Sequence, residues 1–103
     1  MRCTASLAIA CGTLLVLGMT APAQAAPTGQ TIGLTCLACH GDAGQGSGAI
    51  PPLVGRTADQ LYRALLDFKT GQRPATVMDR HAKGYSDEEL KAVADYFASL
   101  PAK

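Results

Sequence analysis

Residues 36–40 have the sequence Cys-Leu-Ala-Cys-His, in which two residues separate the cysteines and a histidine directly follows the second. The whole chain has 103 residues, enough for one domain at most. A domain of that size has a marginal core and usually depends on disulfides, a metal or a cofactor. A bond between Cys36 and Cys39 would close too small a loop to hold a fold together. We therefore expect something other than a disulfide to complete the core.

The first 25 residues are predicted to be a secretory signal peptide. Arg2 supplies a positive start, an apolar run follows over 7–19, and Ala23-Gln24-Ala25 suits a small-x-small cleavage site. The apolar run is too short for a membrane-spanning helix. Cleavage there would leave a single domain of residues 26–103, in which the two cysteines of the motif are the only ones that remain. This leader predicts a periplasmic protein.

The Cys-x-x-Cys-His spacing is the signature of c-type haem attachment. One helical turn between the cysteines places both thiols on the same side as the two vinyl groups of a haem, so both can form thioethers. The adjacent His40 then points its imidazole at the iron as the proximal ligand. Covalent attachment of this kind belongs to compartments outside the cytosol, which agrees with a secreted chain. We predict one covalent haem c, bound through Cys36 and Cys39 and ligated by His40.

Three other uses of the two cysteines compete with haem attachment. A zinc site needs four ligands, but Cys39 and His40 are neighbours that cannot easily both reach one tetrahedral ion, and His81 is the only other histidine of the chain. A thioredoxin-like redox pair would require a βαβ framework, and the sequence shows no alternating strand pattern. A plain disulfide would leave the missing core unexplained. Haem attachment is the prediction that accounts for both the motif and the small core.

Met78 is the predicted sixth ligand of the iron. It is the only methionine that remains after signal cleavage, and it lies 38 residues after His40. A thioether opposite a histidine favours Fe(II) and raises the reduction potential, which suits an electron carrier. Core packing is the ordinary alternative for a methionine, His81 is the rival ligand, and Lys69 or Lys83 is a more remote one. A six-coordinate iron has no open position for substrate, so Met78 argues against a ligand-binding or catalytic haem.

Two further residues are predicted to support the haem without ligating the iron. The carbonyl of Pro51, in a Pro-Pro-Leu-Val-Gly segment, can accept a hydrogen bond from the far ring nitrogen of His40, which would orient the imidazole and make it more basic. Arg73 can pair with a haem propionate through its fork of donors. The alternatives are that the prolines only make the loop rigid and that Arg73 is a solvated surface charge.

Two amphipathic helices are indicated by their end signals. The first begins after Thr57, which has a glutamine three residues later, and Gly71 suits its C-terminal end. The second runs over about 87–100, begins after Ser86, and has a glutamate at the matching position. Both starts have the pattern of a capping box. The chain is therefore predicted to be helical wherever its pattern is regular.

The remaining segments are predicted to be short or irregular. Residues 26–30 are expected to be a flexible start, and a brief helical turn from about Thr31 would lead into Cys36. The segment 41–55 is rich in glycine and proline, which is typical of an irregular loop. The segment 72–85 is expected to be extended or irregular. The predicted architecture is all-α, with a few short helices and long loops around one haem.

The charge of the chain excludes some classes of partner. Arg2 would leave with the signal peptide, so eight of the nine basic residues would balance the eight acidic ones. No basic stripe suggests a nucleic-acid partner, and no charge run suggests a tail. After signal cleavage, no membrane-spanning segment is expected.

Taken together, these motifs resemble those of the class I cytochromes c. That family has an N-terminal helix leading into Cys-x-x-Cys-His, a Pro-x-Leu-x-Gly element, a methionine loop and a C-terminal helix, and the resemblance covers nearly all of residues 26–103. It implies a class I cytochrome c fold, in which the first and last helices cross near a glycine and an aromatic residue. The matching candidates are Gly29 or Gly33 and Tyr96 or Phe97.

Around Met78 the chain is also similar to the haem subunit of flavocytochrome c sulfide dehydrogenase. The similar segments are 68–73, 76–80, 82–86 and 94–97. In that family an FAD-containing flavoprotein oxidises sulfide and passes electrons to the cytochrome subunit, and a single Cys-x-x-Cys-His implies the one-haem form. The resemblance implies an electron-accepting subunit. A free-standing periplasmic shuttle to an oxidase or reductase is the alternative.

Overall fold

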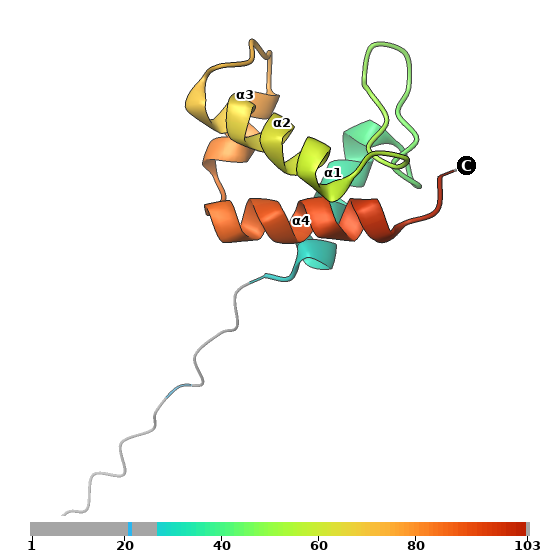
Figure 1. The fold of residues 1–103 in the computed structure, drawn as a ribbon, viewed down its shortest axis with the longest axis horizontal. Helices are drawn as coiled ribbons and strands as arrows, with labels where there is room; N and C mark the ends of the chain where they lie inside the picture. Colours follow the sequence, from blue (N-terminus) through green and yellow to red (C-terminus); the bar gives the residue numbers. More distant parts are fainter. Residues whose placement is uncertain (1–20, 22–26, 103) are drawn as a thin grey trace, which may run out of the picture.

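The computed structural model describes residues 27–102 and the isolated residue 21. The chain forms four helices in the order α1 (Gly29–His40), α2 (Ala58–Thr70), α3 (Met78–Lys83) and α4 (Asp87–Ser99) (Figure 1). The predicted signal peptide lies almost wholly outside the described residues. None of the helices that the structure describes is long and apolar enough to cross a membrane.

The two predicted capping boxes are both present. The hydroxyl of Thr57 accepts a hydrogen bond from the backbone N–H of Gln60 at 3.2 Å, and the Gln60 side chain accepts one from the Thr57 N–H at 3.1 Å. Ser86 and Glu89 form the same reciprocal pair at the start of α4. Gly71 ends α2 with a φ of 80°, a left-handed conformation that glycine adopts without a steric penalty. The expected bounds of α2 and α4 are correct to within a residue.

Helix α1 is longer than the predicted turn. It has 12 residues, and the hydroxyl of its N-cap residue Thr28 accepts a hydrogen bond from the Thr31 N–H at 3.2 Å. The prediction of a flexible start over 26–30 is therefore wrong for the two residues that begin the helix. Two glycines within this segment weaken its intrinsic helix propensity, so only packing against another element stabilises the full length.

The segment 72–85 is also more regular than predicted, because it contains α3. This helix has only six residues, and its N-cap residue Val77 makes no side-chain capping bond. Nothing local to the sequence therefore marks its start. Ala82 is 1% exposed and anchors the short helix against the rest of the protein. Met78 is therefore the first residue of a helix and does not lie in an irregular loop.

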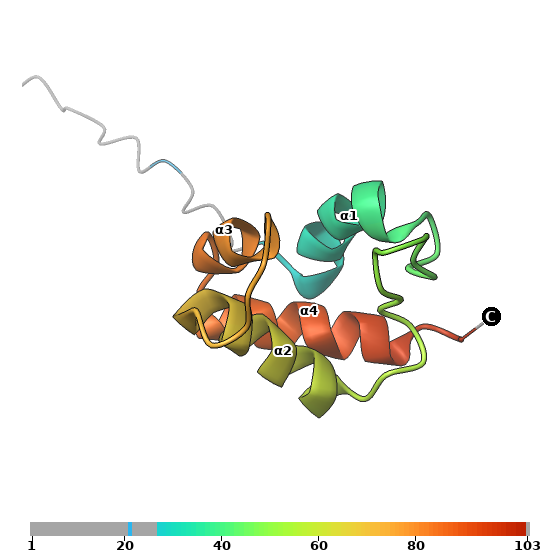
Figure 2. The ribbon, with the colours of Figure 1, turned by 90° about the horizontal axis from the view of Figure 1, so that it is seen from above.

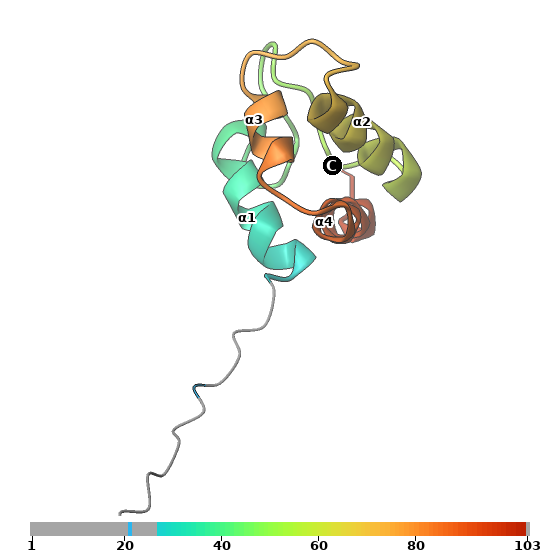
Figure 3. The ribbon, with the colours of Figure 1, turned by 90° about the vertical axis from the view of Figure 1, so that its left-hand side faces the viewer.

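Helix α4 is the centre of the packing. It packs against both α1 and α2, and α2 also packs against α3. In Figure 3, α4 is seen nearly end-on, with α1 on one side and α2 on the other. The buried apolar residues of the described chain gather mainly at these contacts and are Ile32, Val54, Leu61, Ala82, Leu90, Val93, Ala94 and Phe97.

Two glycines of α1 allow it to cross closely over α4 (Figure 1). A Cβ atom on Gly33 would lie 2.5 Å from the ring of Tyr96, and one on Gly29 would collide with the backbone carbonyl of Ala92. Tyr96 also meets the buried ring of Phe97 edge to face, with 5.2 Å between ring centroids. The family resemblance left two glycines and two aromatics as candidates for this crossing, and the structure uses all four.

Candidate haem site

The three residues of the Cys-x-x-Cys-His motif occupy the last turn and a half of α1. Cys36 is half-buried, and its thiol donates to the carbonyl oxygen of Ile32 at 3.6 Å, whereas Cys39 is exposed. Burial raises the pKa of the Cys36 thiol above its ordinary value, because the thiolate loses hydration. The two sulfurs are both free and stand one helical turn apart, as two thioether bonds to one flat group require.

His40 is the one buried polar side chain among the described residues, with 6% of its surface exposed. Its Nδ1 lies 2.7 Å from the carbonyl oxygen of Pro51. A carbonyl oxygen can only accept a hydrogen bond, so Nδ1 carries the proton and Nε2 keeps its lone pair. The hydrogen bond expected from the sequence is therefore present, and it leaves Nε2 available as a metal ligand.

The glycine-rich loop over 41–55 folds back and places the carbonyl of Pro51 beside His40. The N–H of Gly46 donates to the carbonyl of His40 at 2.6 Å, and the N–H of Leu53 donates to the carbonyl of Gly44 at 2.8 Å. Gly46 has a φ of 75°, and a Cβ atom there would lie 2.6 Å from the carbonyl oxygen of Ile50. The loop is thus a specific turn with a glycine at its tightest point, and it places Pro51 beside the proximal histidine.

Met78 lines a hollow between the end of α2 and the segment that leads into α3. The hollow is shallow and open, has a volume of about 460 Å³, and is formed by Phe68, Pro74, Ala75, Thr76 and Met78. Its lining is mostly apolar. A half-buried thioether in such surroundings can ligate a metal without competition from charged side chains.

The helices that carry the two predicted iron ligands do not pack extensively against each other. Helix α1 is held by α4, and α3 is held by α2. Figure 2 shows α1 and α3 on the same side of α4, with α2 on the other side in that view. The thiols and His40 therefore lie on one element, held by α4, and Met78 lies on another, held by α2.

The residues present fit a covalently attached haem. They supply two free thiols one turn apart, a buried imidazole whose Nε2 lone pair is free, and a thioether in an apolar hollow. Zinc fits less well, because no three His, Cys, Asp or Glu side chains within the described part of the chain gather as a metal site.

The rival iron ligands are less well placed. His81 is exposed on α3. The amino group of Lys69 donates hydrogen bonds to the carbonyl oxygen of Tyr85 at 2.8 Å and to the carboxylate of Asp87 at 2.7 Å. Lys83 is exposed at the end of α3. Ligation by Lys69 would have to break two good hydrogen bonds, which favours Met78.

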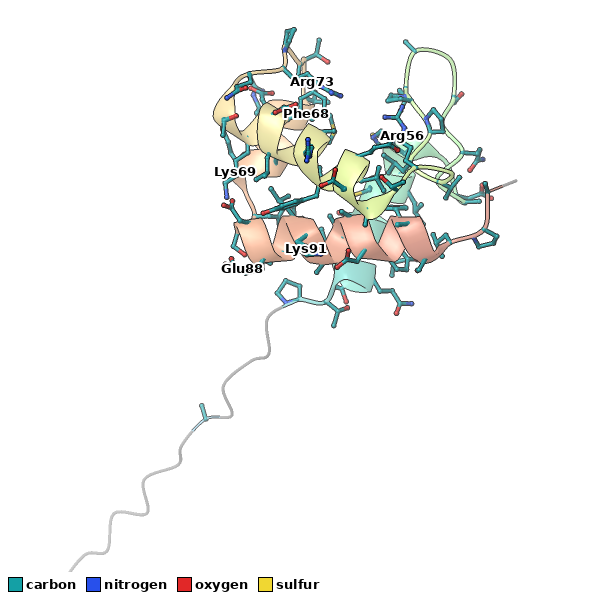
Figure 4. All side chains as sticks on the ribbon, in the orientation of Figure 1. Arg56, Phe68, Lys69, Arg73, Glu88 and Lys91 are labelled. Atoms are coloured by element: carbon teal, nitrogen blue, oxygen red, sulfur yellow. The ribbon has the colours of Figure 1, made fainter. Side chains whose placement is uncertain are left out.

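Arg73 lies at the C-terminal end of α2. Its guanidinium stands over the ring of Phe68, 5.3 Å from the ring centroid, and 4.0 Å from the carboxylate of Asp67 (Figure 4). It lines a second hollow together with Arg56, Gln60, Arg63, Ala64 and Asp67.

Residues 23–97 match the family model described as cytochrome C oxidase, cbb3-type, subunit III. The cytochrome subunit of sulfide dehydrogenase from Chlorobaculum tepidum is 45% identical over 75 residues, which are 73% of this chain and 68% of that protein. The chain belongs to the class I cytochromes c. It therefore carries one covalent haem and transfers electrons.

Two further similar proteins are cytochromes as well. Cytochrome c-554(548) of Halomonas halodenitrificans is 41% identical over 69 residues, which cover 63% of this chain and 83% of that protein. The solved structure of Acidithiobacillus ferrooxidans cytochrome c4 is 38% identical with a TM-score of 0.61, over 63% of this chain and 38% of that chain. The predicted all-α cytochrome fold is confirmed. This chain spans only about two fifths of that cytochrome c4 chain.

Proposed function

We propose that this cytochrome accepts electrons in the periplasm from an FAD-containing flavoprotein that oxidises sulfide, as the one-haem subunit of a flavocytochrome. The similarity to the sulfide dehydrogenase cytochrome subunit, at 45% identity over most of both chains, is the observation that carries the proposal. The signal peptide pattern of the first 25 residues supports the compartment.

Each site residue has a separate role in this proposal. Cys36 and Cys39 would hold the haem through thioethers, and His40 and Met78 would ligate its iron. The Pro51 carbonyl holds the His40 imidazole in one tautomer and makes it a stronger donor. Bound there, haem c supplies an iron that takes up and releases one electron at a time. Ligation by Met78 would favour the reduced iron and would fill the position that a substrate needs, so the chain would carry electrons without binding the substrate.

The electron balance assigns the sulfide chemistry to the flavoprotein. Hydrosulfide loses two electrons and one proton as it becomes sulfur, and the flavin receives the two electrons. This chain takes them one at a time and passes each to the next carrier. None of its described residues has to bind sulfide.

Co-purification without a tag from the native source tests the proposal. A flavin-containing partner is expected to elute with the cytochrome in a stoichiometric amount. Sulfide should then reduce the haem in the isolated complex, but it should not do so at a comparable rate in the cytochrome alone. A cytochrome that elutes by itself from cells rich in the matching flavoprotein would contradict the subunit assignment.

A free-standing electron shuttle is the second candidate. It is favoured by the coverage of cytochrome c-554(548), 83% of whose length this chain matches. In that case the isolated cytochrome should exchange electrons with an oxidase or reductase and should form no stable complex. The same co-purification distinguishes the two candidates.

A further inference from the structure

Asp79 carries a buried oxygen atom that has no partner. Among the described residues, its Oδ1 is the one side-chain oxygen or nitrogen that is shielded from water and makes no hydrogen bond. The four ion pairs of the described chain do not include Asp79 either. A buried acceptor without a donor is costly, so such an atom in a folded protein needs a physical explanation.

Asp79 directly follows Met78 on α3 and lies on the same side of that helix. Both residues are half-buried, and Ala82, about one turn further along, is 1% exposed. Residues three and four positions apart share one side of a helix, so the three residues form the inner face of α3. Consecutive Cα atoms are about 3.8 Å apart, which keeps the carboxylate near the thioether. An iron ligated by Met78 would therefore have this carboxylate as a neighbour.

The charge of such an iron centre depends on its redox state, whereas the charge of a carboxylate does not. A porphyrin carries two negative charges, and imidazole and thioether ligands are neutral. With the propionates left aside, the centre therefore has one net positive charge when oxidised and none when reduced. A nearby negative charge attracts the oxidised centre and stabilises it relative to the reduced one. The unpartnered oxygen of Asp79 would thus have an opposite charge to attract only in the oxidised protein.

We propose that Asp79 provides a negative charge that lowers the reduction potential of the iron and so opposes the effect of the Met78 thioether. The proposal rests on ligation of the iron by Met78, and it holds for any electron donor. It gives the carrier a lower potential than the two axial ligands alone would set. The competing account is that Asp79 only stabilises the positive N-terminal end of α3.

The test compares the haem-loaded wild type with the variants Asp79→Asn and Glu88→Gln. Glu88 is the matched control, because it is the second residue of α4, as Asp79 is of α3. Figure 4 shows Glu88 near the start of α4, where it is exposed. Each change removes one negative charge and keeps the shape of the side chain. The midpoint potential is measured by redox titration at neutral pH, and the near-infrared sulfur-to-iron band is recorded in the same samples.

Asp79→Asn should raise the midpoint potential and retain the band, because the oxidised iron loses a stabilising charge. Glu88→Gln should leave the potential close to that of wild type, because salt at about 0.1 M screens exposed charges over about 10 Å. The increase caused by Asp79→Asn should persist at about 1 M salt, because buried charges are screened much less. Asp79→Glu keeps the charge and should have a potential close to that of wild type.

Equal potentials in Asp79→Asn and Glu88→Gln would overturn the proposal. An unchanged potential, together with a band that disappears at a lower temperature, would also overturn it and would favour the role at the helix end. The same follows if Asp79→Glu raises the potential as much as Asp79→Asn, because side-chain shape would then be the cause. If Asp79→Asn does not retain haem, Asp79→Ser gives the same comparison with a smaller neutral side chain.

These measurements are independent of the test for a flavoprotein partner. A wild-type protein without the sulfur-to-iron band would contradict ligation by Met78 and the role of Asp79 together. Failure to co-purify a flavoprotein would contradict the subunit assignment alone, because the potentials are measured on the isolated cytochrome.

Discussion

At the scale of single residues, the site depends on a short hydrogen bond between His40 and Pro51. The 2.7 Å contact fixes which ring nitrogen carries the proton, and it also restrains the rotation of the imidazole. The restraint comes from a backbone carbonyl, so the side chain of Pro51 matters less than the path of the loop that presents it. Gly46 is the residue that most restricts this path, because its φ is positive and no Cβ atom would fit there.

Gly46→Ala is predicted to destabilise the haem-loaded protein more than Gly48→Ala. Both glycines have a positive φ, so both changes cost about 1–2 kcal/mol from backbone strain. Only at Gly46 would the new Cβ also meet backbone atoms, at 2.6 Å from the Ile50 carbonyl oxygen, whereas nothing lies within 4 Å at Gly48. Thermal unfolding of the two variants measures the difference. Equal melting temperatures would show that the loop is not tight at Gly46.

Met78→Ala is predicted to remove the near-infrared sulfur-to-iron band and to lower the reduction potential. If Met78 ligates the iron as proposed, the change removes a thioether that stabilises Fe(II) more than the imidazole does. His81→Ala is the matched control, three residues later on the same short helix, and should retain both properties. A Met78→Ala protein with an unchanged band would show that another residue ligates the iron.

At the scale of elements, hydrogen bonds hold both ends of the segment 72–85, which carries Met78, against the last turns of α2. At its start, the N–H of Arg73 donates to the carbonyl of Asp67 at 3.1 Å. At its end, the amino group of Lys69 bridges the carbonyl of Tyr85 and the carboxylate of Asp87. Helix α3 has no capping side chain of its own, so these contacts hold it in place.

Lys69→Met is predicted to weaken ligation by Met78 without changing the ligand. The change keeps the aliphatic stem of Lys69 but removes two hydrogen bonds, which together contribute about 1–2 kcal/mol because the side chain is only partly exposed. The sulfur-to-iron band should therefore disappear at a lower temperature than in wild type. The band is followed during heating, at a temperature below that of global unfolding.

Lys91→Met provides the control for this prediction. Lys91 also pairs with a carboxylate, that of Asp95 at 3.0 Å, but this pair lies within α4 and is more exposed. The temperature at which the band disappears should be close to that of wild type. If Lys69→Met and Lys91→Met behave alike, the bridge from α2 does not hold the methionine segment.

At the scale of the whole molecule, the protein core is small. Among the described residues, Leu90 is the only large side chain with less than 2% of its surface exposed. The two helices that flank the proposed haem are each held by another helix and not by each other. We therefore expect a bound haem to supply much of the apolar contact that stabilises this fold.

A Cys36→Ala, Cys39→Ala double variant is predicted to lose most of its helical structure. Without thioethers the haem is held only by its axial ligands, and a domain of this size retains little stability from its own core. Far-ultraviolet circular dichroism of the double variant and of the haem-loaded wild type measures the loss. A double variant with wild-type helix content and no bound haem would show that the protein core suffices.

Much of the site could be predicted from the sequence, because its signals are local. The spacing of Cys36, Cys39 and His40 within one helical turn already determines which side of the helix they share. The capping boxes of α2 and α4 likewise join residues three positions apart. The sequence predicts Met78 as an iron ligand because no other methionine remains after signal cleavage.

Other features were decided only by tertiary structure, because they depend on contacts between distant segments. The full length of α1 depends on α4, against which Gly29 and Gly33 pack. The formation of α3 depends on burial of Ala82 and not on a capping residue. The linear sequence shows which residues are close to one another along the chain, whereas these contacts form only when the helices pack together.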